Sequence, residues 1–220
     1  MSCTKINLVV KSILLSMVPL SFFYLIIWFS GCNKIAEEKK EAAISLTIGN
    51  LNKAYGKSVN RQKLYTLFSA QAQKEKRKEI ARLFLALARS EQIHAGSHAA
   101  MLRSLSVEPL SVSEELIPVG STMQTLKMAL SMEDIAYGTM YQSMISCAEK
   151  ENHPECAKHL RFIQDTEAKH AELLRYALYK NMQLPVLPYK ICKCCGYVLT
   201  TEQTDNCPCC KGKKDLFEAI

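Results

Sequence analysis

Two short segments, Glu91-Gln-Ile-His94 and Glu167-Ala-Lys-His170, decide the fold of this chain of 220 residues. In an α-helix, which has about 3.6 residues per turn, a Glu and a His three positions apart project from the same face. Four-helix bundles can hold a pair of metal ions with Glu-x-x-His on each of two helices and a single Glu on each of the other two. The two segments therefore predict a mainly α protein built on a four-helix bundle.

The chain contains an internal repeat. The interval in sequence from Glu91 to Glu167, the first residues of the two motifs, equals the interval from Tyr65 to Tyr141. We therefore interpret the chain as two copies of one helical hairpin, each of which contributes a Glu-x-x-His motif and a tyrosine.

The repeat also indicates that one expected carboxylate is missing. Glu133 precedes the Glu167 motif and would be the single carboxylate of the second half. The equivalent position ahead of Glu91, at the same interval, is Lys57, and the segment 42–74 contains no Asp or Glu at all. The sequence thus supplies three of the four carboxylates that such a bundle uses.

Apolar periodicity and helix-breaking residues predict four helices, over residues 42–73, 76–105, 121–150 and 154–182. Ser121 is a suitable N-cap, and Pro154 fits the first turn of a helix. Residues 106–120 contain two prolines and no helical period. A long crossover of this kind joins parallel helices in ferritin-like bundles. We therefore expect a ferritin-like four-helix bundle over residues 43–183.

The N-terminal segment is apolar from Ser12 to Gly31 except for serines and one proline. About 20 helical residues at ~1.5 Å each span a ~30 Å hydrocarbon core, so residues 1–32 predict a membrane anchor. The apolar region is longer than the ~7–15 residues of a secretory signal, which favours a retained single transmembrane helix. Phe29-Ser-Gly-Cys32 resembles a bacterial lipoprotein box, so a lipid anchor at Cys32 is the alternative. Lysines on both flanks leave the side of the membrane open, and residues 33–42 form a charged spacer.

The length and charge suit one medium domain with a small module attached. The formal net charge is +7. No nucleic-acid recognition motif accompanies the lysine clusters, so we expect no nucleic-acid partner.

The cysteines predict a metal site near the C-terminus. Six of the ten cysteines lie between positions 192 and 210. They form two Cys-x-x-Cys knuckles, Cys192 to Cys195 and Cys207 to Cys210, with the short segment 196–206 between them. Four thiolates in this arrangement bind iron or zinc tetrahedrally. Residues 184–190 then form a proline-containing linker, and residues 191–220 a separate module in which Cys194 and Cys209 are expected to be spectators.

From about residue 43 to the C-terminus, the chain resembles the rubrerythrins. The resemblance lies in the order of a bundle with two Glu-x-x-His motifs followed by a rubredoxin-like module, which the Gly-Tyr after Cys195 and Phe217 also match. It implies reduction of hydrogen peroxide at a diiron centre, in defence against oxidative stress, with electrons arriving from an unidentified donor through an Fe(Cys)4 site. It also implies a homodimer in which one chain's module approaches the other chain's bundle. The implied bundle ligands are Glu91, His94, Glu133, Glu167 and His170; the implied catalytic residues beside them are Tyr65 and Tyr141; the implied iron ligands of the module are Cys192, Cys195, Cys207 and Cys210.

The chain departs from this family pattern in two places. Lys57, or Ser58 if the register moves by one residue, replaces the carboxylate of the first helix, and Ala136 replaces a further carboxylate one turn after Glu133. Lys57 either pairs with a bundle carboxylate at the place of one metal or extends to solvent. The bundle would accordingly hold two iron or other divalent ions, one, or none.

Three functions are compatible with these residues. The first is a membrane-tethered rubrerythrin-like peroxidase. The second is an electron-transfer or metal-binding protein whose bundle is not catalytic. The third is a structural membrane protein with a zinc ribbon. Among the remaining histidines, His98 is a reserve ligand one turn after His94, and His153 and His159 are expected on the surface.

Overall fold

The computed structural model describes the backbone of residues 20–113, 118–200 and 205–220, and side chains within these ranges from residue 46 onward. The chain divides into two compact units, Met1–Ala42 and Ala43–Ile220. The expected membrane segment begins outside the described backbone, and all of its side chains, with Cys32, lie outside the described residues. No helix in the described part of the chain holds an apolar stretch long enough to cross a membrane.

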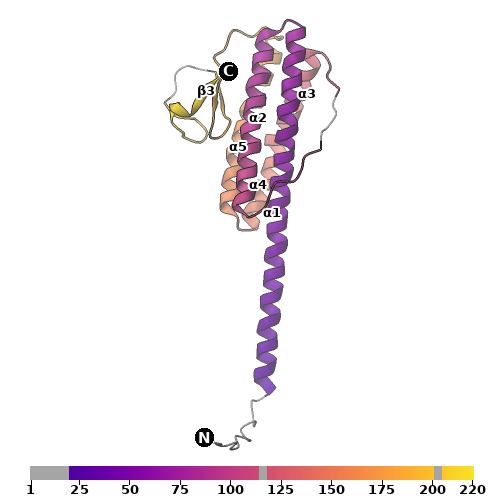
Figure 1. The fold of residues 1–220 in the computed structure, drawn as a ribbon, viewed down its shortest axis with the longest axis vertical. Coiled ribbons are helices and arrows are strands. Elements are labelled where there is room, and N and C mark those ends of the chain that lie inside the picture. Colours follow the sequence, from indigo (N-terminus) through magenta and orange to yellow (C-terminus); the bar gives the residue numbers. More distant parts are fainter. Residues whose placement is uncertain (1–19, 114–117, 201–204) are drawn as a thin grey trace, which may run out of the picture. The chain divides into compact units, whose positions relative to one another are not determined.

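The expectation of a mainly helical protein is confirmed (Figure 1). The helices are α1 (Leu20–Lys74), α2 (Lys78–Ser104), α3 (Thr122–Ile135), α4 (Tyr141–Lys150) and α5 (Pro154–Tyr179). A π-helical segment, η1 (Ala136–Met140), joins α3 to α4. The expected third helix is therefore interrupted shortly after Glu133. π-Turns of this kind are rare and occur frequently at functional sites.

Local sequence signals set two of the helix starts as expected. The Ser121 hydroxyl caps α3 by accepting from the backbone N–H of Gln124, whose side chain in turn accepts from the Ser121 N–H at 2.8 Å. Pro154 lies in the first turn of α5, where its missing N–H costs no helical hydrogen bond. These caps orient the two helices that carry Glu133 and the second Glu-x-x-His motif.

Two apolar clusters fill the bundle. One contains Tyr65, Phe68 and Phe84, whose rings lie 5.4 to 6.1 Å apart between centroids. The other contains Tyr141 and Leu160. Burying each such side chain contributes about 1.5–3 kcal/mol. Each cluster thus includes one of the two tyrosines expected at the site.

The C-terminal module is a small antiparallel sheet with the strand order β2-β1-β3. Its strands are β1 (Lys190–Cys192), β2 (Val198–Leu199) and β3 (Phe217–Ala219), and a short 3₁₀ turn (Lys214–Leu216) precedes β3. The first cysteine knuckle lies in the β1–β2 connection, where Gly196 has a φ of +80° and its N–H donates to the carbonyl of Cys192 at 2.7 Å. A left-handed φ suits glycine, which lacks a Cβ.

The module packs against the bundle of its own chain (Figure 1). Tyr189, Ile191 and Val198 belong to the same apolar cluster as Phe84 of α2. An ion pair between Arg89 of α2 and Glu218 of β3 lies at the edge of this contact. The cysteine knuckles are thereby held beside α2 and α5, the two helices with Glu-x-x-His motifs.

Candidate metal centres

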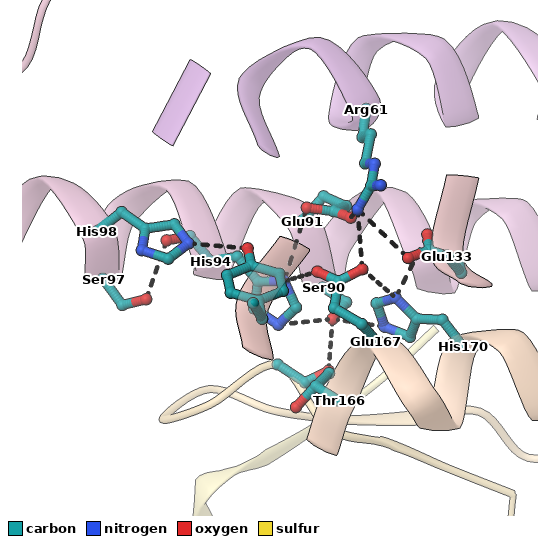
Figure 2. Close-up of polar contacts among 12 residues, drawn as sticks. Arg61, Ser90, Glu91, His94, Ser97, His98, Glu133, Thr166, Glu167 and His170 are labelled. Atoms are coloured by element: carbon teal, nitrogen blue, oxygen red, sulfur yellow. Dashed lines mark hydrogen bonds and ion pairs between the residues drawn. The ribbon is translucent and has the colours of Figure 1, made fainter. Parts of the chain in front are cut away.

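Four helical segments converge on one buried cluster of acids and imidazoles (Figure 2). Its side chains come from α2, α3 and α5, with one cation and one tyrosine from α1. All five predicted bundle ligands are fully buried: Glu91, His94, Glu133, Glu167 and His170. The structure therefore brings together the residues that the two motifs and the repeat singled out.

The ligand atoms of this cluster lie within reach of one small ion. One ligand atom from each of Glu91, Glu133, Glu167 and His170 lies within 4.8 Å of the others. His94 adds its Nδ1 atom at 3.2 Å from Oε1 of Glu167. The arrangement has the size and the mixed oxygen and nitrogen donors of a metal site.

Arg61 of α1 reaches into the same cluster. Its Nη1 atom lies 2.9 Å from Oε2 of Glu167, 3.3 Å from Oε2 of Glu133 and 3.5 Å from Oε1 of Glu91. Its Nη2 atom donates to the carbonyl of Met132 at 2.7 Å. Sequence reasoning missed this residue. Arg61 lies about one helical turn before Tyr65, so that spacing could have placed it on the site face.

Of the two roles left open for Lys57, pairing with a bundle carboxylate is not the one seen among the described residues. The cation that contacts the bundle carboxylates is Arg61, and Lys57 is half-buried in the wall of a groove between α1 and residues 110–113. Ser58 is buried, and Ala136 is fully buried at the start of the π-turn. A hydroxyl and a methyl group stand where the family resemblance implied carboxylates, so neither supplies a negative charge.

Burial and mutual repulsion set the charges of the cluster. Burial, together with neighbouring Glu133 and Glu91, raises the pKa of Glu167 well above its usual value. Burial acts in the same direction on Glu133, but the Arg61 guanidinium, with the neighbouring Glu167 and His170, outweighs it and lowers the pKa of Glu133. Burial opposes the charge on Arg61, yet the three carboxylates raise the Arg61 pKa further. The guanidinium of Arg61 thus forms ion pairs with three buried acids.

Several polar atoms of the cluster are left for a ligand. Among the described residues, both carboxylate oxygens of Glu91, Oε1 of Glu167, and Nδ1 of His94 and of His170 have no hydrogen-bond partner. Each unpaired buried polar atom costs about 1–3 kcal/mol. Carboxylate oxygens with neutral imidazole nitrogens bind iron, manganese or zinc ions well. The residues present therefore fit a divalent cation.

Hydrogen bonds connect the Nε2 atom of each imidazole to the C-terminal module, directly for His94 and through Ser90 of α2 for His170. Ser90 donates its hydroxyl proton to the carbonyl of Gly196 at 2.6 Å, so it accepts from Nε2 of His170 at 2.9 Å. His94 donates from Nε2 to the carbonyl of Cys195 at 3.1 Å. With the protons on Nε2, both Nδ1 atoms keep a lone pair for a metal.

The two tyrosines have different partners. Tyr65 donates to Oε1 of Glu133, and burial and that carboxylate raise the pKa of Tyr65. Tyr141 pairs with Nε2 of His98 at 3.2 Å. Burial is also the main cause of the raised Tyr141 pKa.

His98 and His159 form an unexpected imidazole pair. Nδ1 of His98 lies 2.9 Å from Nε2 of His159, and the rings meet edge to face. His98 thus contacts Tyr141 and His159 in place of the bundle carboxylates. His159, which was expected on the surface, is partly exposed but packs against His98, and burial lowers its pKa to about 4. His159 lies about three helical turns before His170, which is the signal that could have placed it.

The four cysteines of the module form a second site. The Sγ atoms of Cys192 and Cys210 lie 3.7 Å apart, and those of Cys195 and Cys207 lie 3.6 Å apart. A tetrahedral ion with four sulfurs at about 2.3 Å places them about 3.8 Å from one another. Cys194 is exposed, so the structure groups the four predicted ligands without it.

The remaining knuckle cysteine, Cys209, faces the bundle. Its thiol donates to the carbonyl of Phe162 in α5 at 3.4 Å. Cys209 is therefore engaged between the module and α5, and it is absent from the group of four.

Comparison with known proteins agrees with this architecture. The sequence model of the rubrerythrin family matches residues 49–178. The chain is 30% identical to a putative rubrerythrin of Methanocaldococcus jannaschii, over 78% of this chain and 91% of that protein. It is 26% identical to rubrerythrin-2 of Clostridium acetobutylicum, over 80% of this chain and 97% of that protein. A solved structure of fully reduced, all-ferrous nigerythrin has a TM-score of 0.73 at 27% identity, over 79% of this chain and 86% of that one.

Proposed function

The chain belongs to the rubrerythrin family, and on that premise we propose that it is a non-haem iron protein that reduces hydrogen peroxide. An iron ion held by the module would pass electrons to a metal ion held by the bundle. The net reaction would consume one peroxide, two electrons and two protons, break the O–O bond and release two water molecules. The module ligands are Cys192, Cys195, Cys207 and Cys210; the bundle ligands are Glu91, His94, Glu133, Glu167 and His170.

Iron supplies one-electron chemistry at both sites, because it is stable in the ferrous and the ferric states. The protein residues hold it and set the charge around it. The carboxylates balance the charge of a bound cation in a buried setting, where an isolated ion would be unfavourable. The Ser90 and Cys195 contacts to the outer imidazole nitrogens orient the rings for binding through Nδ1.

One observation supports electron transfer within the chain. The carbonyl of Cys195 accepts the hydrogen bond from His94 Nε2 at 3.1 Å. The thiolate of Cys195 belongs to the module site, and the Nδ1 atom of His94 faces the bundle site. A single hydrogen bond thus links one ligand residue of each centre, with both side chains almost fully buried.

A chain of hydrogen bonds supports proton supply. His159 is partly exposed, contacts His98, and His98 contacts the hydroxyl of Tyr141. Burial keeps the pKa of both histidines below the usual value, so the imidazoles are neutral near pH 7 and can each accept and donate a proton. The route ends at a tyrosine that the family resemblance places beside the metals.

The protein's setting is part of the proposal. The apolar residues 12–31, or a lipid at Cys32, would tether it to a membrane, and a homodimer would place one module near the bundle of the partner subunit. An external donor of electrons would reduce the module.

The second candidate is an electron-transfer or metal-binding protein with a non-catalytic bundle. The position of Arg61 among the carboxylates favours it, as does Ala136. Both features reduce the number of groups available to hold metals.

Rapid mixing separates the two candidates. The detergent-solubilised full chain is loaded with iron, reduced without oxygen and mixed with hydrogen peroxide, while the colour of oxidised Fe(Cys)4 is followed. A peroxidase regains this colour rapidly, and Glu167→Gln slows the change by at least tenfold. Glu172→Gln on the exposed side of the same helix is the matched control. Equal rates in the wild type and Glu167→Gln would support the non-catalytic candidate.

A further inference from the structure

We propose that Arg61 takes the place of one metal ion, so that the bundle site holds a single divalent cation. The inference rests on the metal-binding part of the proposed function and specifies its stoichiometry. Arg61 would act as a permanent internal cation that the chain itself supplies.

The three carboxylates each turn one oxygen to Arg61 and the other to an imidazole. Glu167 places Oε2 at 2.9 Å from Arg61 Nη1 and Oε1 at 3.2 Å from His94 Nδ1. The two oxygens of Glu91 are placed in the same way, with Oε1 3.5 Å from Arg61 Nη1 and Oε2 3.6 Å from His94 Nδ1.

Glu133 completes the pattern with the other imidazole. Its Oε2 lies 3.3 Å from Arg61 Nη1, and its Oε1 lies 3.8 Å from His170 Nδ1. The carboxylates therefore bridge two places. One already contains the guanidinium, and the other is lined by imidazole nitrogens that have no hydrogen-bond partner among the described residues.

The charges match one divalent ion. Metal ligands bind in their ionised form, and three ionised carboxylates with one guanidinium leave two negative charges, which a single divalent cation neutralises. Two such cations beside Arg61 would leave two uncompensated positive charges at fully buried residues, which is strongly unfavourable.

Arg61 is fixed in this place. Its second nitrogen, Nη2, donates to the carbonyl of Met132 at 2.7 Å, and the residue is only 8% exposed. A guanidinium keeps its proton under all physiological conditions, and the three acids raise its pKa further.

The described part of α1 that faces the site also lacks the acid that a second ion would need. No Asp or Glu lies in the segment 42–74, which includes the part of α1 that faces the site. Ala136 offers only a methyl group. Three carboxylates and two imidazoles can complete the coordination of one ion and leave a second one short of ligands.

Manganese is the probe that counts ions in the bundle. The module of the full chain is first filled with zinc, which thiolates prefer, and Mn²⁺ is then titrated, since carboxylates and imidazoles accept it. Calorimetry gives the number of ions bound per chain. Electron paramagnetic resonance distinguishes an isolated Mn²⁺ ion from a magnetically coupled pair.

The wild type should bind one Mn²⁺ with the spectrum of an isolated ion. Arg61→Glu should bind two with the spectrum of a coupled pair, because it removes the cation and restores a carboxylate on α1. Lys57→Glu is the matched control on the same helix and should still bind one. Arg61→Lys, which keeps the charge, should also stay at one.

Each other outcome is decisive. Two ions in the wild type would overturn the inference but leave the metal-dependent function standing. No ion in the wild type would overturn both. An Arg61→Glu protein that folds and still binds one ion would show that Arg61 does not set the number. If that variant fails to fold, the wild-type count still decides.

Discussion

The imidazole of His94 donates a hydrogen bond from Nε2 to the carbonyl oxygen of Cys195, 3.1 Å away. His94 belongs to the first Glu-x-x-His motif of the bundle, and Cys195 is one of the predicted metal ligands of the module. Both are almost fully buried. The two candidate metal centres are thus joined through a contact that depends on how closely the module backbone approaches α2.

Gly196 makes this close approach possible. A Cβ atom at Gly196 would lie 2.7 Å from both His94 Nε2 and Ser90 Oγ, and its φ of +80° is strained for any other residue. We expect Gly196→Ala to cost at least about 1–3 kcal/mol and to push the module away from α2. Denaturant unfolding measures the first effect. Proteolysis in linker residues 184–189 measures the second.

Gly96 on α2 provides the control for that change. A Cβ there meets nothing within 4 Å, so Gly96→Ala should stabilise the helix by up to about 1 kcal/mol. Equal linker cleavage in the wild type and Gly196→Ala would contradict the role assigned to Gly196.

Ser90 should control metal affinity without touching the metal. Ser90→Ala removes the acceptor of His170 Nε2 and the donor to Gly196 O. Loss of an orienting partner of a metal-bound histidine typically weakens metal binding about 10–100-fold. Titration with Mn²⁺ measures the change. Ser97→Ala, which removes only a bond to the His94 carbonyl on the same helix, should leave affinity near the wild-type value.

His159 should make stability depend on pH. Its pKa is lowered from 6.5 to about 4, mainly by burial, so between these values the unfolded chain binds a proton that the folded chain does not. The contribution of His159 to the free energy of unfolding is complete above about pH 6.5, falls as the pH is lowered, and stops changing below about pH 4. At about 1.4 kcal/mol per pKa unit, His159 should account for a loss of about 2 kcal/mol between pH 7 and pH 5.

Unfolding of the wild type and His159→Gln at the two pH values checks this expectation. Helical circular dichroism follows the transition, and the loss of stability on acidification should be smaller in the variant by the share assigned to His159. The lowered pKa of His98 acts in the same direction, and its main cause, the burial of His98, is present in both proteins. Identical pH dependence in the two proteins would contradict the buried position of His159.

Adjacent cysteines of the first knuckle should respond differently to substitution. Cys195→Ser removes a buried sulfur that lies 3.6 Å from that of Cys207, whereas the Cys194 thiol is exposed. We expect Cys195→Ser to lose the Fe(Cys)4 absorption and Cys194→Ser to keep it. Retention of the native spectrum by Cys195→Ser would show that Cys194 or Cys209 replaces it as a ligand.

Local spacing was enough to predict much of this protein. The Glu-x-x-His motifs placed each acid and imidazole on one helical face, because a helix repeats every turn regardless of its neighbours. The cysteine knuckles likewise encoded their own site, since four sulfurs close in sequence can meet around one ion. Ser121 and Pro154 marked helix starts through their own backbone preferences. Membership of the rubrerythrin family, suggested by the order of these motifs, was confirmed by the comparisons.

Only the tertiary structure decided which cation neutralises the acids. The repeat placed Lys57 at the missing carboxylate and left open whether it pairs with an acid or reaches solvent, whereas the rotation of α1 against α2, α3 and α5 turns Arg61 toward the carboxylates. The packing of α5 against α2 brought His159 to His98, and the packing of the module against α2 brought the Cys195 carbonyl to His94. Helical periodicity fixes which residues share a face, whereas packing between distant segments fixes what that face meets. Local spacing could therefore place Arg61 and His159 on a helix face, but not the partner that each meets there.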